Sequence, residues 1–261
     1  MADLKISRVT NPDEIFNVLP VVKSAWGMDD PSQLVKDILT AMNFHGGLVL
    51  IAWDGDKPTG MHFSFPGRYN GRNYLYSHMT GIVEAKKSSG IGYSLKMKQR
   101  EWAIENGYDL IVWTFDPLMA LNAHFNFGKL GVISRSYRRN FYGTMDDSLN
   151  RGLPTDRFIV EWWIKQKKAR HDPARFVIDV GNAPEIDENL PDQLIVKIPA
   201  DFKRIKAEDI SYASTIRLRS REVFEYLFSH GYAALDFFKE IPGYLFAKEP
   251  DEEAHFGMRI F

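Results

Sequence analysis

The chain contains no cysteine among its 261 residues. This excludes disulfide bonds, thiolate zinc sites and cysteine nucleophiles. An excess of charge is also missing, because 33 Lys and Arg residues stand against 34 Asp and Glu residues. We therefore expect no electrostatically driven partner such as nucleic acid. The longest apolar run, residues 48–53, is far shorter than the ~20 residues of a membrane helix. The first residues carry no apolar leader, and we expect a cytoplasmic protein that does not bind membranes.

The residues that are present are typical of a folded protein, with 44% hydrophobic and 26% charged. Apolar spacing over residues 4–163 predicts one strand, two helices, three strands, a helix, a strand, a helix and two strands. Capping residues predict helix starts near Asn11 and at residues 30–32. A smaller strand–helix–strand pattern follows over residues 194–238. We therefore predict an α/β domain at 1–165 and a small C-terminal α/β appendage at 166–261.

The most informative segment is residues 81–92, Gly-Ile-Val-Glu-Ala-Lys-Lys-Ser-Ser-Gly-Ile-Gly. It joins a predicted strand at 74–83 to a helix that starts at the second glycine of the Gly-x-Gly pair. Unpaired N–H groups at a helix N-terminus carry partial positive charge, and this geometry favours a phosphate. An ordinary strand-to-helix turn remains the alternative. A dinucleotide fingerprint would require glycine at Leu95, and the segment has no P-loop Gly-Lys-Ser/Thr.

In this segment the chain resembles the GNAT superfamily of acyl-CoA-dependent N-acyltransferases. Residues 87–92 match its Gln/Arg-x-x-Gly-x-Gly/Ala signature, with Lys87 at the first position as a departure that keeps the charge. Residues 122–131 match a second motif, an Asn/Ala helix that ends in aromatic-x-Lys-x-Gly. The strings at 113–118 and 137–143 are similar to a branch of predicted acetyltransferases with a C-terminal extension. The resemblance covers about residues 4–163.

The resemblance implies a mixed, mostly antiparallel sheet with a V-shaped splay, flanked by helices, and a smaller C-terminal β-α-β appendage. The arm of acetyl-CoA, the implied co-substrate, would fill the gap between strands 74–83 and 110–115. No metal would be needed. The residues implied to contact CoA are Ile82, Val83, Lys87, Ser88, Ser89, Gly90, Ile91, Gly92, Tyr93, Asn122, Phe127 and Lys129.

The reaction that the resemblance implies is direct attack of an amine on the thioester carbonyl, and this attack requires a base. His78, Glu84 and Asp116 are the candidates near the gap. Each has a structural alternative. His78 could be a packed, hydrogen-bonded core residue, Glu84 could be solvated, and Asp116 could cap the helix that follows.

The proton donor to the departing thiolate is the clearest departure from the family. Phe127 stands where the family often has a tyrosine. Tyr137 and Tyr142 are possible substitutes, with aromatic packing between strands as their alternative. A thiol with a pKa near ~8.5 leaves reasonably well without full protonation, so the activity does not depend on this group alone.

The acceptor side is defined by Trp26 and by an arginine cluster around the last two strands, in which we single out Arg138 and Arg157. Such arginines could bind a carboxylate or phosphate, or could be solvated. We predict an N-acyltransferase, with acetyl as the expected acyl group and the amine of a small metabolite as the acceptor. A catalytically inactive CoA-binding module for sensing or assembly is the alternative. The aromatic appendage could close the acceptor pocket or form a homodimer interface.

Overall fold

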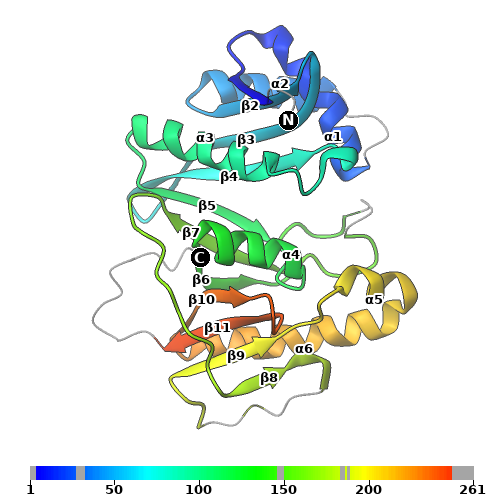
Figure 1. Ribbon diagram of the computed structural model, residues 1–261, viewed down its shortest axis with the longest axis vertical. Coiled ribbons are helices and arrows are strands. Elements are labelled where there is room, and N and C mark those ends of the chain that lie inside the picture. Colours follow the sequence, from blue (N-terminus) through cyan, green and yellow to red (C-terminus); the bar gives the residue numbers. More distant parts are fainter. Residues whose placement is uncertain (1–3, 28–32, 146–149, 183–185, 187–188, 249–261) are drawn as a thin grey trace. The chain divides into compact units, whose positions relative to one another are not determined.

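The computed structural model describes residues 4–27, 33–145, 150–182, 186 and 189–248. The helix start predicted at residues 30–32 lies outside these ranges. Two compact units divide the chain: the first contains the described residues of 1–113, and the second contains those of 114–248 (Figure 1). The boundary predicted at residue 165 stays a prediction. Among the described helices, none combines the length and apolarity needed to cross a bilayer.

The first unit alternates helices and strands much as the apolar spacing predicts. Its elements are β1 (Leu4–Arg8), a 3-10 helix (Pro12–Val18), α1 (Leu19–Trp26), α2 (Gln33–Phe44), β2 (Leu48–Asp54), β3 (Lys57–Tyr69), β4 (Arg72–Ile82), α3 (Ile91–Glu105) and β5 (Leu110–Phe115). The predicted start of the first helix is confirmed. The Asn11 side chain accepts from the N–H of Asp13 at 3.0 Å, and the Glu14 side chain accepts from the N–H of Asn11 at 3.4 Å. Both bonds satisfy backbone groups that a helix end leaves open.

The strands of the first unit lie in the order β1-β2-β3-β4-β5. The first four are antiparallel neighbours, and β4 and β5 are parallel. Strand period 2 sends alternate residues of β3 to opposite faces. On one face, Met61 and Phe63 pack in a core with Val18 of the 3-10 helix and Val22 of α1. The opposite face packs Leu48, Leu50 and Ala52 of β2 against Ile91 and Leu95 of α3, and α3 lies along this face in Figure 1.

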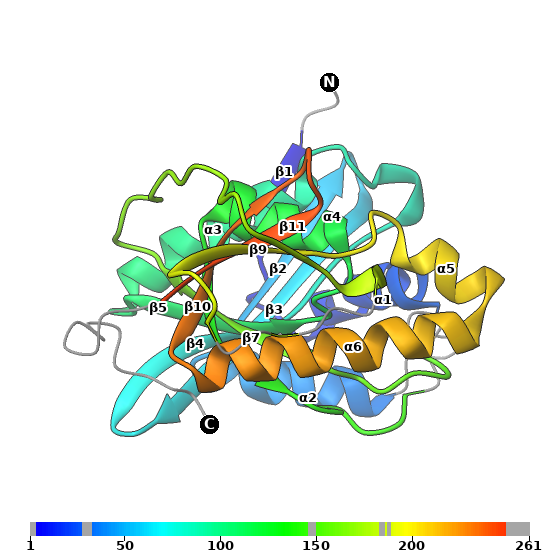
Figure 2. The same cartoon turned by 90° about the horizontal axis from the view of Figure 1, so that it is seen from below.

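The second unit contains α4 (Ala120–Ala123), a π-helical segment (His124–Leu130), β6 (Ile133–Arg138), β7 (Arg157–Trp163), β8 (Val177–Asp179), β9 (Gln193–Lys197), α5 (Phe202–Glu208), α6 (Ile210–Ser229), β10 (Tyr232–Phe238) and β11 (Gly243–Lys248). Its strands lie in the order β7-β6-β10-β11-β9-β8. All neighbours are antiparallel except β8 and β9. The long helix α6 is prominent in Figure 2.

An aromatic core holds the second unit together. The ring of Phe158 on β7 lies 4.7 Å from Phe224 on α6 and 5.2 Å from Tyr244 on β11, between ring centroids. Tyr244 also packs on Phe127 at 5.4 Å and donates a hydrogen bond to the carbonyl of Pro117 at 2.6 Å. Residues 114–164 and residues 193–248 therefore share one core.

The predicted mixed, mostly antiparallel sheet flanked by helices is confirmed. The C-terminal segment is more elaborate than the predicted β-α-β pattern, because β8 and β11 are present as well. Both were missed because β8 has only three residues and β11 follows a short turn after β10. The single helix of the pattern predicted over residues 194–238 is two helices, divided at Asp209. The Asp209 side chain accepts from the N–H of Tyr212 at 2.9 Å and caps α6.

Cutting the chain after Lys168 should prevent the second unit from folding. The truncation removes Phe224, Tyr244 and the strand β10, which pairs with β6. Phe158 and Phe127, which are fully buried in the intact chain, would face water, and the exposed apolar surface would favour aggregation. Thermal melts followed by circular dichroism would test this. A single cooperative transition at the wild-type temperature would contradict it.

Candidate functional site

In the first unit, the connection from β4 to α3 is a tight turn followed by an uncapped helix. Residues Glu84–Lys86 form one 3-10 turn, and the backbone then takes positive φ at Ser88 (+65°) and Gly90 (+89°). The N-cap residue of α3 is Gly90, which has no side chain to cap the helix. The first N–H groups of a helix have no partner within the helix, so those of Ile91, Gly92 and Tyr93 are available to an anion.

The two glycines of this loop serve different purposes. Gly90 adopts a left-handed backbone conformation that L side chains rarely take. Gly92 is helical, and a Cβ placed there would approach only the Cδ1 of Ile82, at 3.0 Å. Because that atom is the end of a flexible side chain, the backbone does not require glycine at position 92. A side chain at position 92 would stand in the first turn of α3, beside its free N–H groups.

The lysines of the loop are both in ion pairs. Lys87 contacts Glu84 three residues earlier, and Lys86 lies 2.6 Å from Asp54. Glu84, a predicted base, therefore lies next to a cation, with its side chain largely exposed. Its backbone N–H donates to the hydroxyl of Ser24 on α1 at 3.1 Å, which attaches the end of α1 to the end of β4.

Strands β4 and β5 separate soon after they meet. They pair only at Leu75↔Ile111 and Tyr76↔Val112, although β4 continues to Ile82. From Ser77 onward, no strand among the described residues pairs with the edge of β4 that faces β5. The predicted V-shaped splay is present, and Ile82, predicted to contact CoA, lies at its open end, with Val83 next in the chain.

His78 is the extra residue at a register shift between β3 and β4. Met79 pairs with Phe63 and Ser77 pairs with the next residue, Ser64, so His78 between them has no paired residue on β3. The imidazole centroid lies 6.0 Å from those of Phe63 and Phe65, and the residue is exposed to solvent. Partial desolvation by its neighbours lowers the pKa of His78 below its ordinary value, so the ring is neutral at neutral pH and has a lone pair to accept a proton.

Trp26, predicted to line the acceptor side, lies against β4. Its indole ring covers Gly81 so closely that no side chain could be placed there. Glycine at this position therefore allows the end of α1 to pack on β4. The structure thus brings Trp26 next to the strand that carries His78.

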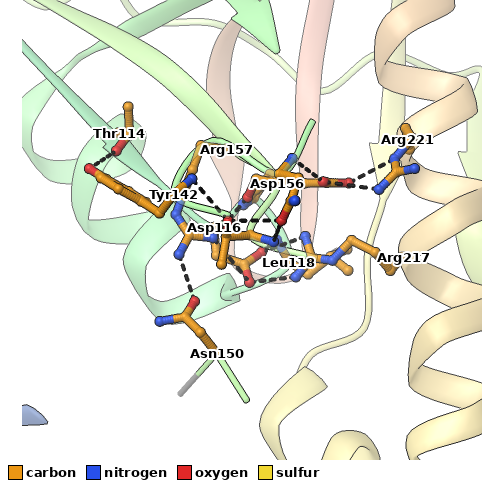
Figure 3. A network of polar contacts seen from close by, with 12 residues as sticks. Thr114, Asp116, Leu118, Tyr142, Asn150, Asp156, Arg157, Arg217 and Arg221 are labelled. Atoms are coloured by element: carbon orange, nitrogen blue, oxygen red, sulfur yellow. Dashed lines mark hydrogen bonds and ion pairs between the residues drawn. The ribbon is translucent and has the colours of Figure 1, made fainter. Parts of the chain in front are cut away.

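The second unit contains the other predicted residues, several of which join one buried polar network (Figure 3). Asp116 accepts from both terminal nitrogens of Arg217 on α6, at 2.9 and 2.5 Å, and from the N–H of Leu118 at 2.9 Å. Burial by itself would raise the pKa of Asp116, but the charges of Arg217 and Arg157 and these hydrogen bonds lower it below the ordinary value. A carboxylate held ionised in this way is a weak base.

Tyr137 is bound to the same network through a second carboxylate. Its hydroxyl donates to Asp156 at 2.5 Å, and Asp156 also accepts from Arg221 at 2.9 and 3.0 Å. Burial and the hydrogen bond to Asp156 raise the pKa of Tyr137. Its proton is therefore held more tightly than that of an ordinary tyrosine, which makes it a poor acid.

Tyr142 and Arg157 lie together at one side of this network (Figure 3). The Arg157 guanidinium is 5.5 Å from the centroid of the Tyr142 ring and donates to Asn150 at 2.6 Å. The Tyr142 hydroxyl lies 2.9 Å from that of Thr114. Tyr142 is exposed, whereas Tyr137 is half-buried. Arg138 is the last residue of β6.

The remaining cofactor-contact predictions fall on the α4 region. Asn122 and Lys129 are exposed, whereas Phe127 is fully buried in the aromatic core. Sequence reasoning missed Asp156, Arg217 and Arg221. The only signal was the spacing of the two arginines, four residues apart on one helix face, which is equally typical of a solvated face. The described residues hold no group of three or more His, Asp or Glu side chains arranged to bind a metal ion.

No family model and no curated protein matches the sequence. Among solved structures, yncA from Salmonella typhimurium, solved with its cofactor acetyl-CoA, is 14% identical and matches 64% of this chain and 96% of its own, with a TM-score of 0.51. A GNAT family acetyltransferase from Elizabethkingia anophelis with acetyl-CoA bound is 17% identical and matches 62% of this chain and 99% of its own, with a TM-score of 0.47. A GNAT family protein from Desulfovibrio desulfuricans is 15% identical, with the same coverage and a TM-score of 0.48.

These proteins are matched over nearly their full length, whereas more than a third of this chain has no counterpart in them. At such low identity, the comparison with yncA establishes a shared fold and leaves the reaction open. The chain therefore shares its fold with yncA, a putative acetyltransferase.

Proposed function

We propose that this protein is an acyl-CoA-dependent N-acyltransferase that acts on the amine of a small metabolite. One observation carries the proposal: in the described part of the chain β4 and β5 pair at two positions and then separate, directly before a helix whose N-cap residue, Gly90, has no side chain to cap it. An extended arm with amide groups can hydrogen-bond to the open edge of β4, and a pyrophosphate can accept from the free N–H groups of α3. The fold shared with yncA, a protein solved with acetyl-CoA, supports the same reading.

In this proposal the loop residues Lys87–Tyr93 hold the pyrophosphate and the edge of β4 near Ile82 holds the arm. The thioester supplies an activated carbonyl carbon and a thiolate leaving group. The acceptor must lose a proton before it attacks, and His78 is the base we favour among the three candidates. The lowered pKa of His78 leaves its ring neutral and able to accept a proton. In contrast, the Asp116 carboxylate is ion-paired with Arg217, and the Glu84 carboxylate is ion-paired with Lys87.

For the proton returned to the thiolate, Tyr142 is a better candidate than Tyr137. The Tyr137 proton is held by Asp156, and transferring it would leave two negative oxygens side by side. The predicted acceptor contacts of Arg138 and Arg157 remain proposals. Arg157 is buried and already donates a hydrogen bond to Asn150. In this proposal it positions neighbouring side chains such as Tyr142 and does not itself bind the acceptor.

Binding of CoA is tested by thermal stability. Acetyl-CoA at a hundredfold its Kd should stabilise the folded protein by about 2.7 kcal/mol, since a ligand that binds only the folded state shifts unfolding by mass action. NAD and ATP at equal concentration are the matched controls. A melting temperature unchanged by millimolar CoA but raised by NAD or ATP would contradict the proposal.

Turnover is tested separately, by release of free thiol from acetyl-CoA across a panel of small amines. Thiol release that depends on the amine supports a transferase. Tight CoA binding without thiol release for any amine would favour the inactive CoA-binding module, for which Phe127 in place of a tyrosine is the motivating residue.

Replacing His78 by alanine should lower kcat by about 10²–10⁴-fold, because a positioned base contributes that much to a proton transfer. Affinity for CoA should be unchanged. The wild-type rate should fall on the acid side, below pH 6.5, as the imidazole becomes protonated, since its pKa is lowered from 6.5. The variant should lack this acid limb. Glu84→Gln is the control, and a Glu84→Gln rate loss equal to that of His78→Ala would exclude His78 as the sole base.

A further inference from the structure

The face of the sheet under α3 contains a cluster of buried polar side chains in the first unit. Its members come from neighbouring strands and one helix: His62 and Ser64 on β3, Ser77 on β4, and Lys96 and Gln99 on α3. His62 and Ser64 are two residues apart and so share one face of β3. Ser77 pairs directly with Ser64, and Lys96 and Gln99 lie one helical turn apart.

Lys96 is the only charged member of this cluster, and it is 3% exposed. Its ammonium donates to the Ser77 hydroxyl at 2.7 Å and to the Gln99 side-chain oxygen at 3.2 Å, and it lies 3.7 Å from the centroid of the Trp113 ring. No carboxylate among the described residues pairs with it. Burial lowers the pKa of Lys96 to about 7, because removing water from the ammonium disfavours its charged form.

Three further atoms in the cluster lack partners. The Nε2 of His62, the Oγ of Ser64 and the side-chain nitrogen of Gln99 are buried and form no hydrogen bond. The Nδ1 of His62 is already engaged with the Thr80 hydroxyl at 2.9 Å. Buried polar groups without partners are rare and costly in folded proteins. The Gln99 amide and the Ser64 hydroxyl are therefore donors left open in the same cluster as the Lys96 ammonium.

The cluster lies where β4 and β5 separate. The last paired residues of the two strands are Tyr76 and Val112. Ser77 and Trp113, both in contact with the Lys96 ammonium, are the residues that follow them. Along the open edge of β4, from Ile82 back to Ser77, the strand spans about 17 Å at about 3.3 Å per residue. An extended phosphopantetheine arm whose pyrophosphate lies at the N-terminus of α3 covers such a span.

We propose that this cluster binds a carboxylate, supplied by the far end of a dicarboxylic acyl group on CoA. The inference rests on the proposed CoA site and assigns the class of acyl donor. One cation without a counter-ion matches one carboxylate. A water molecule would satisfy the open donors but would leave the charge of Lys96 uncompensated. The methyl group of an acetyl donor would neither accept hydrogen bonds from the open donors nor compensate the charge of Lys96.

The test compares binding of succinyl-CoA and acetyl-CoA by calorimetry. The wild-type protein should bind succinyl-CoA on the order of tenfold more tightly, as expected for one charge-assisted contact. Binding of succinyl-CoA above neutral pH should also take up protons, because the carboxylate favours the charged form of Lys96. Acetyl-CoA should bind without this uptake.

Lys96→Met keeps the length of the side chain and removes its charge, so it should fold and bind the two thioesters equally. Lys98→Met is the matched control, because Lys98 lies two residues away with a 53% exposed side chain paired to Glu101. It should keep the wild-type preference. Melts of both variants verify folding.

Equal affinity of the wild-type protein for the two thioesters would overturn the proposal and leave the CoA site intact. Failure of both to bind would overturn the CoA site, and this proposal with it. Free succinate is the last comparison. If it stabilises the wild-type protein at the concentration where succinyl-CoA does, and Lys96→Met abolishes the effect, the carboxylate does not come from the acyl group.

Discussion

Gly92→Val is expected to weaken CoA binding by at least about 100-fold, which corresponds to roughly 2.7 kcal/mol, while the protein still folds. The valine side chain would project from the first turn of α3 into the space where phosphate oxygens must approach the free N–H groups. The fold should tolerate it because a Cβ at this position meets only the end of the Ile82 side chain. Calorimetric titration of the folded variant with CoA measures the loss.

A second glycine separates this steric effect from a general loss of stability. Gly55 lies in the turn between β2 and β3 with φ of +59°, and a Cβ there meets nothing within 4 Å. Gly55→Ala should therefore lower stability through its backbone conformation and leave CoA affinity unchanged. Gly92→Ala should fall between wild type and Gly92→Val. Normal affinity in folded Gly92→Val would remove this loop from the CoA site.

Asp116→Asn is expected to lower the free energy of unfolding by about 3–5 kcal/mol, because it leaves the buried guanidinium of Arg217 without its counter-charge. Arg217 is 2% exposed and forms both of its carboxylate contacts with Asp116. Melting temperature and urea titration measure the loss. In contrast, Glu101→Gln removes an exposed ion pair with Lys98 and should change stability by no more than about 1 kcal/mol.

The pH dependence of stability gives an independent check on Asp116. Because its pKa is lower in the folded than in the unfolded protein, its contribution is complete above the unfolded pKa and is lost as pH falls through the folded pKa. The stability of wild type should therefore fall more steeply in acid than that of Asp116→Asn. Asp116→Leu combined with Arg217→Met should recover part of the loss, since an apolar pair can replace a buried ion pair. A stability loss in Asp116→Asn no larger than in Glu101→Gln would show that the pair does not hold the unit together.

Local patterns were sufficient for most of the elements. The capping residues Asn11 and Glu14 and the apolar run of residues 48–53 each act over a few neighbouring residues, so the sequence contains their whole cause. The glycine loop before α3 is equally local, because the free N–H groups belong to the helix end itself. The loop could therefore be proposed as an anion site from the sequence alone.

The buried charge networks could not be predicted in this way. Asp116 and Arg217 are 101 residues apart, and Asp156 and Arg221 are 65 apart. Arginines on a helix look the same in a sequence whether they face water or a carboxylate. The partner of the candidate base Asp116 is Arg217 on α6, and the partner of the candidate acid Tyr137 is Asp156, directly before β7. No local pattern connects either residue to its partner.

Lys96 and Lys98 show most clearly what each level decided about this protein. The sequence alone determined that both lie on the helix that follows the glycine loop, because helix starts and apolar spacing are properties of adjacent residues. Only the tertiary structure decided that Lys96 is buried at the separation of β4 and β5 while Lys98 remains in water. The physical reason is that burial depends on which strands pack under the helix, and the same side chain takes a lowered pKa only where that packing removes water from its charge.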